Sequence, residues 1–175
     1  MKRKEINYLD FDVDKLTRSI ENVISGDSFL TDVSALQLND LPQITKKKKW
    51  LFDWKNELNS DDREVYKLTI QNNPSIIQGL VSLKIEIDHV YMFLIESAPF
   101  NKGRNKIYLG VPGNLVAYAC RLSFQKGYNG FLAFHSKTML VDHYIKTLGA
   151  KHQGGQLMII DTEAAKKLVD KYFKS

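Results

Sequence analysis

The residues best suited to binding or catalysis surround a glycine turn, Gly110–Gly113. This turn lies between a basic loop and an apolar helical run that starts at Leu115. The strand before that loop, Val90–Ala98, is rich in β-branched and aromatic residues. Pro99 ends it, because proline has no amide hydrogen to donate. The first amides of a helix lack helical partners, and the helix dipole draws negative charge toward them. A strand, a glycine turn and a helix start therefore predict an anion-binding site.

The elements before this turn predict a helix followed by antiparallel strands. Val13, Leu16, Ile20 and Val23 share one helical face, and Gly26 follows as a C-cap. These residues predict a helix over about Asp12 to Ser25. Alternating apolar and polar residues, with turn residues between the runs, predict a meander of four strands and a short helix after the first of them. The four strands are expected at about 28–38, 66–71, 77–87 and 90–98.

The elements after the turn change the character of the sheet. A helix from Leu115 to near Gly127 leads into Phe131–Phe134, a wholly apolar run typical of a strand that is buried on both faces. A strand–helix–strand unit implies parallel neighbours and a right-handed crossover. The fold class is therefore α+β, with a mixed and mostly antiparallel sheet. A helix over Thr138–Leu148, a strand over Gln156–Ile160 and a last helix carrying Leu168 and Tyr172 complete the prediction.

Composition restricts the class of protein. The chain has 175 residues, 43% of them hydrophobic, which predicts a single domain over 1–175 with a real core. No apolar run approaches the roughly 20 residues of a membrane span, so a cytoplasmic protein without a membrane partner is expected. One cysteine, Cys120, excludes an internal disulfide, and the scattered histidines predict no metal. A net charge of +5 suits an anionic ligand. The lysines at 46–49 are interpreted as a solvated helix end rather than a nucleic-acid site.

The order of these elements resembles the GNAT superfamily of acyl-CoA-dependent N-acetyltransferases, over about Asp12 to Ile160. Its local marks are Leu94–Ser97 at the end of the fourth strand, Gly110–Asn114 at the helix start and Tyr144–Gly149 after the fifth strand. In the family signature Q/R-x-x-G-x-G/A, Gly113 matches the first glycine, while Gly110 and Leu115 depart from the pattern. The resemblance implies a V-shaped splay between the fourth and fifth strands.

The resemblance also implies acetyl-CoA as co-substrate. Its diphosphate would bind the amides at the helix start, with help from the basic loop. Its pantetheine arm would lie along the fourth strand like an added strand, where a bulge is expected. The residues predicted to bind the cofactor are Ile95, Ser97, Arg104, Val111, Gly113, Asn114, Leu115 and Ser136.

Acetyl transfer to an amine requires a base and an acid. Glu96 is the candidate base, because it lies beside the expected thioester. The equally weighted alternative is a structural role, in which its carboxylate pairs with Arg104 or a lysine. Alternation places Glu96 on the face of Met92 and Leu94. Tyr144 is the candidate acid for the departing thiolate, and core packing is its structural alternative.

Two functions are compatible with these residues. The first is an N-acetyltransferase that works by direct attack of a primary amine in a ternary complex. The second is a catalytically inactive GNAT-fold module that binds CoA, a protein or nucleic acid. The sequence leaves the acceptor open between a small molecule and a protein, and it leaves a homodimer open. The first function requires a gap between the two strands and uncovered amides at Gly113.

Overall fold

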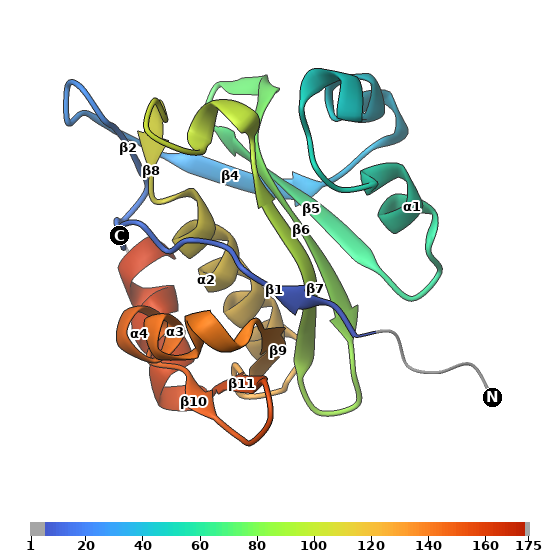
Figure 1. Cartoon of the computed structure of the whole chain (residues 1–175), viewed down its shortest axis with the longest axis vertical. Coiled ribbons are helices and arrows are strands. Elements are labelled where there is room, and N and C mark those ends of the chain that lie inside the picture. Colours follow the sequence, from blue (N-terminus) through green and yellow to red (C-terminus); the bar gives the residue numbers. More distant parts are fainter. Residues whose placement is uncertain (1–5, 174–175) are drawn as a thin grey trace.

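The computed structural model describes residues 6–173, and within them eight strands form one mixed sheet (Figure 1). A path of seven strands crosses it, and β1 (Tyr8–Leu9) pairs with β9 off this path. In spatial order the seven are β10 (Lys151–His152), β11 (Leu157–Ile160), β9 (Leu132–Ser136), β7 (Val90–Ser97), β6 (Asn73–Ile85), β5 (Glu64–Ile70) and β4 (Thr31–Ala35).

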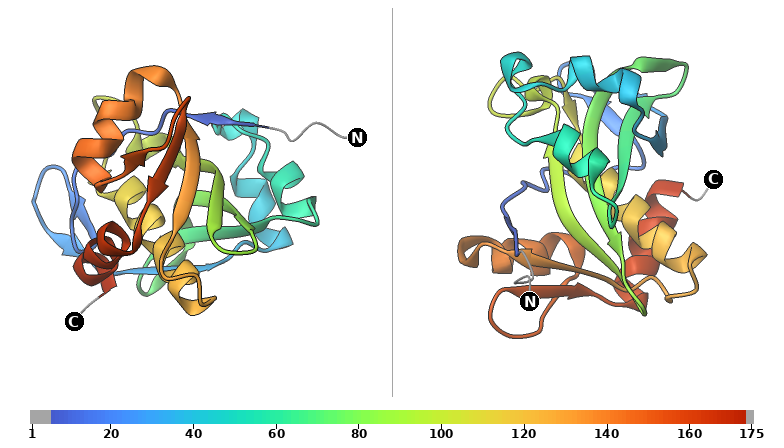
Figure 2. Two further views of the ribbon diagram at one scale, coloured as in Figure 1. Left: turned by 90° about the horizontal axis from the view of Figure 1, so that it is seen from below. Right: turned by 90° about the vertical axis from the view of Figure 1, so that its right-hand side faces the viewer.

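Strands β4 to β7 form the predicted antiparallel meander. One face carries the 3-10 helices η1 (Leu38–Gln43) and η2 (Lys46–Lys48) and helix α1 (Trp54–Asn59), and two tryptophans are buried on this face. Helix α2 (Val111–Gln125) packs on the other face. β7 is therefore covered on both faces, as its two apolar sets predicted (Figure 2). It ends at Ser97, just before Pro99 opens the 3-10 turn η3 (Pro99–Asn101).

Helix α2 connects β7 to β9, and these two strands pair in parallel, as expected for a strand–helix–strand unit. The 3-10 turn η4 (Thr138–Leu140) and helix α3 (Val141–Leu148) follow, and Gly149 ends α3 at a φ of +69°. Helix α4 (Thr162–Phe173) closes the described chain. These elements confirm the predicted second half. None of the helices within residues 6–173 has the length and apolarity needed to cross a bilayer.

The predicted helix over Asp12–Ser25 is wrong, because this part of the chain contains no helix: it is irregular up to Ser19 and then forms a short strand and a turn. Its second half forms β2 (Ile20–Asn22), which pairs with β3 (Ser28–Phe29) and with β8 (Tyr108–Leu109) in a small separate sheet. Gly26 lies in the turn between β2 and β3, where its φ of +77° suits glycine, and not at a helix end. Tertiary strand pairing overrides the helical spacing of the apolar residues here. The strand predicted at 28–38 is split between β3 and β4 for the same reason.

Candidate functional site

The predicted splay is present beside β7. Among the described residues, β7 pairs with β9 at Val90–Leu132 and Tyr91–Ala133, whereas its ladder with β6 continues to Ser97. A bulge coincides with the point of separation: Leu94 pairs with Ser82 and Met92 with Leu83, which leaves Phe93 between them. The bulge turns β7 away from β9. It also corrects one prediction, since Glu96 shares a face with Leu94 but not with Met92.

The splay is filled by the chain itself. β1 runs parallel to β9 inside it, with Tyr8 opposite His135 and Leu9 opposite Ser136 (Figure 1). On the other side, the Asn7 side-chain amide donates to the Phe93 carbonyl at 3.0 Å, at the bulge of β7. We call residues 7–17 the slot segment. Its backbone takes the position between the two strands that the family resemblance assigns to a pantetheine arm.

Tyr144 meets the slot segment from α3. Its hydroxyl donates to the Phe11 carbonyl at 2.7 Å, and the two rings stack with their centroids 4.5 Å apart. The Tyr144 side chain is fully buried, and burial raises the pKa of its phenol. The Tyr144 hydroxyl therefore points into the splay. The Tyr144 ring packs in the core, as the structural alternative required. Its role as an acid stays a prediction.

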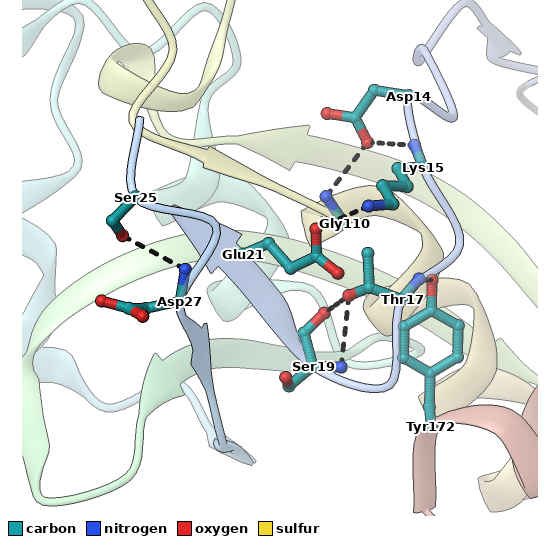
Figure 3. Close-up of polar contacts among 9 residues, drawn as sticks. All are labelled: Asp14, Lys15, Thr17, Ser19, Glu21, Ser25, Asp27, Gly110 and Tyr172. Atoms are coloured by element: carbon teal, nitrogen blue, oxygen red, sulfur yellow. Dashed lines mark hydrogen bonds and ion pairs between the residues drawn. The ribbon is translucent and has the colours of Figure 1, made fainter. Parts of the chain in front are cut away.

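The start of α2 is covered by the slot segment as well. The Gly110 amide donates to Asp14 Oδ1 at 3.1 Å (Figure 3). Lys106 Nζ lies 3.1 Å from Asp14 Oδ2. The Gly110 amide thus binds an anion, which is a carboxylate of the same chain. Binding of a diphosphate by the amides of Val111, Gly113, Asn114 and Leu115 stays a prediction. The Thr17 amide donates to the Tyr172 hydroxyl at 3.1 Å. A Cβ at Gly113 would overlap that hydroxyl, so Gly113 is needed for the close approach of Tyr172.

Glu96 is buried within a set of donors. Its carboxylate accepts from Trp54 Nε1 at 2.8 Å and from Lys102 Nζ at 2.5 Å, and also from the amides of Leu51 at 2.8 Å and Phe52 at 3.3 Å. Only 3% of the residue is exposed. These contacts tie the loop before α1 and the loop after β7 to the sheet. The pairing with a lysine that the structural alternative required is present, while the role of Glu96 as a base stays a prediction.

The other predicted residues separate into those near the splay and those away from it. Ile95 and Ser97 line a cavity of about 270 Å³ beside Glu96, which Phe11 and Asp14 of the slot segment also line. Ser136 is buried opposite Leu9, and its hydroxyl donates to the Lys137 carbonyl. Arg104 is exposed in the loop after β7. Val111, Gly113, Asn114 and Leu115 are buried at the start of α2.

Sequence reasoning missed the slot segment, although a signal for it exists. Leu9, Phe11 and Val13 alternate with three aspartates, and this period of two indicates extended chain. The structure buries Leu9 and Val13, half-buries Phe11, and leaves Asp10 exposed. Tyr172 was predicted only as a core residue of the last helix. Nothing local in the sequence indicates its contact with Gly113.

In this conformation the splay does not fit acetyl-CoA. The edge of β9 is paired with β1, and the α2 amide of Gly110 is bonded to Asp14. Leu16 and the Tyr172 hydroxyl lie over Gly113. An acyltransferase needs a gap between the two strands and an uncovered helix start. Here the strands separate, but β1 occupies the gap and Asp14 covers the helix start.

Comparisons with known proteins agree with the geometry. No protein-family model matches the chain, and no curated protein matches it by sequence. Solved structures do match. One is a spermidine N-acetyltransferase chimera of SpeG from Vibrio cholerae and hSSAT, at 17% identity and a TM-score of 0.58, covering 78% of this chain and 98% of that one.

Two further solved structures are similar. A tyrosine-to-phenylalanine mutant of the AtaT toxin, bound to the C-terminus of the antitoxin AtaR and to acetyl-CoA, matches at 15% identity and a TM-score of 0.56, over 79% of this chain and 97% of that one. The ribosomal-protein-S18-alanine N-acetyltransferase from Escherichia coli matches at 12% identity and a TM-score of 0.50, over 74% and 91%. The chain therefore has the fold of the GNAT N-acetyltransferases, in a divergent form.

Proposed function

We propose that this chain is an N-acetyltransferase that moves an acetyl group from acetyl-CoA to a primary amine by direct attack in a ternary complex. The observation that supports it is the splay: β7 is bulged at Phe93 and leaves β9 after two residue pairs of the described chain. Tyr144 directs its hydroxyl into the space between them.

Two side chains receive roles in this proposal. Tyr144 is the proton donor, since its hydroxyl already donates a hydrogen bond into the splay. Glu96 is the base for the amine, because the cavity that it lines with Ile95 and Ser97 adjoins the slot segment. Both carboxylate oxygens are occupied, so this role requires one contact, such as that with Lys102, to open when the amine binds.

The test is the release of free thiol from acetyl-CoA in the presence of amines. The panel includes spermidine, peptides with a free N-terminus or lysine, and an aminoglycoside. Tyr144→Phe is expected to slow release by about 100-fold, within the usual range for losing a general acid. Tyr66→Phe is the matched control, since Tyr66 lies in β5, which β6 separates from β7, and its hydroxyl also donates one hydrogen bond, to Glu64 at 2.5 Å. Equal rates for the two variants would remove Tyr144 from the chemistry.

A second candidate function is a GNAT-fold binding module without catalysis. The observation that favours it is that the splay and the start of α2 are both occupied by the chain's own residues. Thermal-shift titration separates the candidates, because a ligand that binds the folded state raises the midpoint of unfolding. No response to acetyl-CoA, together with salt-sensitive binding of RNA or DNA, would favour the module.

A further inference from the structure

The slot segment makes three kinds of contact in the splay, and an acyl-CoA has a group for each. The backbone of β1 pairs with β9, and a pantetheine arm carries amides that pair in the same way. The Phe11 carbonyl accepts a hydrogen bond from the Tyr144 hydroxyl, where a thioester would offer sulfur and oxygen. The Asp14 carboxylate binds the Gly110 amide and Lys106, where a diphosphate would offer its oxygens.

The order of these contacts along the slot segment also matches the order of the corresponding groups along an acyl-CoA. Leu9 lies between the strands, Phe11 faces Tyr144, and Asp14 is at the helix start. The five steps between the six residues Leu9 to Asp14 span at most about 17 Å of extended chain. An acyl-CoA is likewise an extended arm with its negative charge toward one end, so segment and cofactor cannot occupy the splay together.

The slot segment has little strand pairing of its own, and its buried side chains, such as Leu9 and Val13, hold much of it in place. After Ser19, the fully buried Ile20 and the pairing of β2 with β8 anchor the backbone. Before it, β1 is two residues long, and Tyr8 and Asp10 are exposed. Short ladders with exposed side chains open at a lower free-energy cost than long buried ones. Arg18, which is exposed and directly follows the slot segment, is the place where the backbone would turn if the segment left.

We infer that the slot segment is an intramolecular competitor of the acyl-CoA, and that the structure shows the self-inhibited state of the protein. The inference rests on the proposed function and deepens it. Acyl-CoA binds after the segment has left the splay, so its apparent affinity equals the intrinsic affinity multiplied by the fraction of open molecules. Ligands or partners that hold the segment outside the splay activate the protein.

A reversible lock tests this inference on the full chain. Tyr8 and His135 are partners in the β1–β9 ladder, and adjacent strands lie about 4.8 Å apart, within the Cα separation of a disulfide. The double variant Tyr8→Cys/His135→Cys is oxidised, titrated with acetyl-CoA by calorimetry, reduced and titrated again. The native Cys120 is buried in α2 and does not compete. The oxidised form is expected to bind at least about tenfold more weakly than the reduced form.

A matched pair of charge variants tests the same point without a lock. Asp14→Asn weakens the contact with Gly110 and Lys106, while Asp10→Asn removes the same charge from the same segment at an exposed pair with Lys137. Asp14→Asn is expected to tighten acetyl-CoA binding about tenfold, and Asp10→Asn less than about twofold.

The outcomes distinguish the inference from the proposed function. If the oxidised and reduced forms bind acetyl-CoA equally, and the two aspartate variants respond alike, the competitor role is wrong while cofactor binding stands. If neither the reduced form nor Asp14→Asn binds acetyl-CoA at millimolar concentration, the proposed function fails and the competitor role fails with it. A thermal melt of each protein confirms that it is folded before titration.

Discussion

The two edges of β7 are built in different ways. Toward β6, the ladder runs from Val90 to Ser97 and belongs to one hairpin, so its partners are close in sequence. Toward β9, the described chain has two paired residues and then the slot segment, which is distant in sequence and bonds by a mixture of side chains and backbone. The first edge is a long ladder, interrupted once by the bulge at Phe93, and its loss would unfold the sheet. The second edge depends on separate contacts, each of which another molecule could supply.

The largest effect is expected for Glu96→Ala, at the end of β7. This change leaves Lys102 without its buried partner and Trp54 Nε1 without an acceptor. Breaking a buried charged pair costs about 3–5 kcal/mol in the free energy of unfolding, or about 10 °C in Tm for a chain of this size. Thermal unfolding measures it. Glu163→Ala, at an exposed glutamate of α4, is the control and should shift Tm by about 1–2 °C at most.

That result also bears on the chemistry of Glu96. A lost activity with an unchanged Tm would mean that its four hydrogen bonds stabilise little, and that the carboxylate is free to act as a base. A large loss of Tm would identify the residue as part of the permanent structure around β7, in contrast to the contacts of the splay.

A smaller effect is expected for Gly113→Ala, on the splay side. The added Cβ overlaps the Tyr172 hydroxyl and lies 3.1 Å from Leu16 Cδ2. Overpacking of this kind costs about 1–3 kcal/mol. Tyr172→Phe removes the overlapping oxygen, so the double variant should be more stable than the sum of the two single changes predicts. Urea denaturation of the four proteins measures this coupling. Strict additivity would show that Tyr172 does not lie over Gly113.

Much of the fold follows from local patterns in the sequence. The meander is predicted because each of its strands alternates or is wholly apolar and ends at turn residues, as at Asn72 and Asp88. The helix C-cap at Gly149 follows from the same kind of signal. The helix predicted from Asp12 failed because strand pairing, of β2 with the nearby β3 and the distant β8, overrides the helical spacing of the apolar residues.

The sequence indicated an anion-binding helix start, but it did not indicate which group covers that helix start in the structure. Gly110 and Gly113 indicated an anion at the start of α2, and the sequence had no means of showing that the anion is Asp14. The bulge at Phe93 shifts which residues share a face, and no local pattern specifies its position. Long-range pairing and bulges are tertiary properties, so period and spacing do not reveal them.

An effect of about 1 kcal/mol is expected for the stability of Tyr144→Phe, because one neutral hydrogen bond to the Phe11 carbonyl is lost while the ring stays packed. The slot segment should then open more often. Hydrogen exchange of the amides at 8–14 measures this opening, and it should become several-fold faster while the amides of β6 keep their protection. Equal changes in both regions would mean that the segment belongs to the same cooperative unit as the sheet, and the contrast between the two edges of β7 would be lost.

The smallest effect on stability is expected at the far edge of the sheet, beside β10 and β11. This edge is separated from β7 by β9, so it serves as a reference for the stability changes predicted on either side of β7. Asp161 Oδ1 accepts from the Ala164 amide at 3.0 Å, and Oδ2 pairs with Lys151 at 2.7 Å. The hydrogen bond from Lys151 is the main cause that lowers the pKa of Asp161 below its usual value. A depressed carboxyl pKa contributes stability above the pKa of the unfolded chain, near 3.9, and this stability is lost as the pH falls further. The free energy of unfolding, measured by urea denaturation, should therefore fall less steeply below about pH 4 in Asp161→Asn than in the unmodified protein. Asp170→Asn, at an exposed aspartate of the adjoining helix α4, should leave this pH dependence unchanged. If the free energy of unfolding falls equally below about pH 4 in both variants, the pairing of Asp161 with Lys151 adds no stability. The pair could then not serve as a reference for the stability changes around β7.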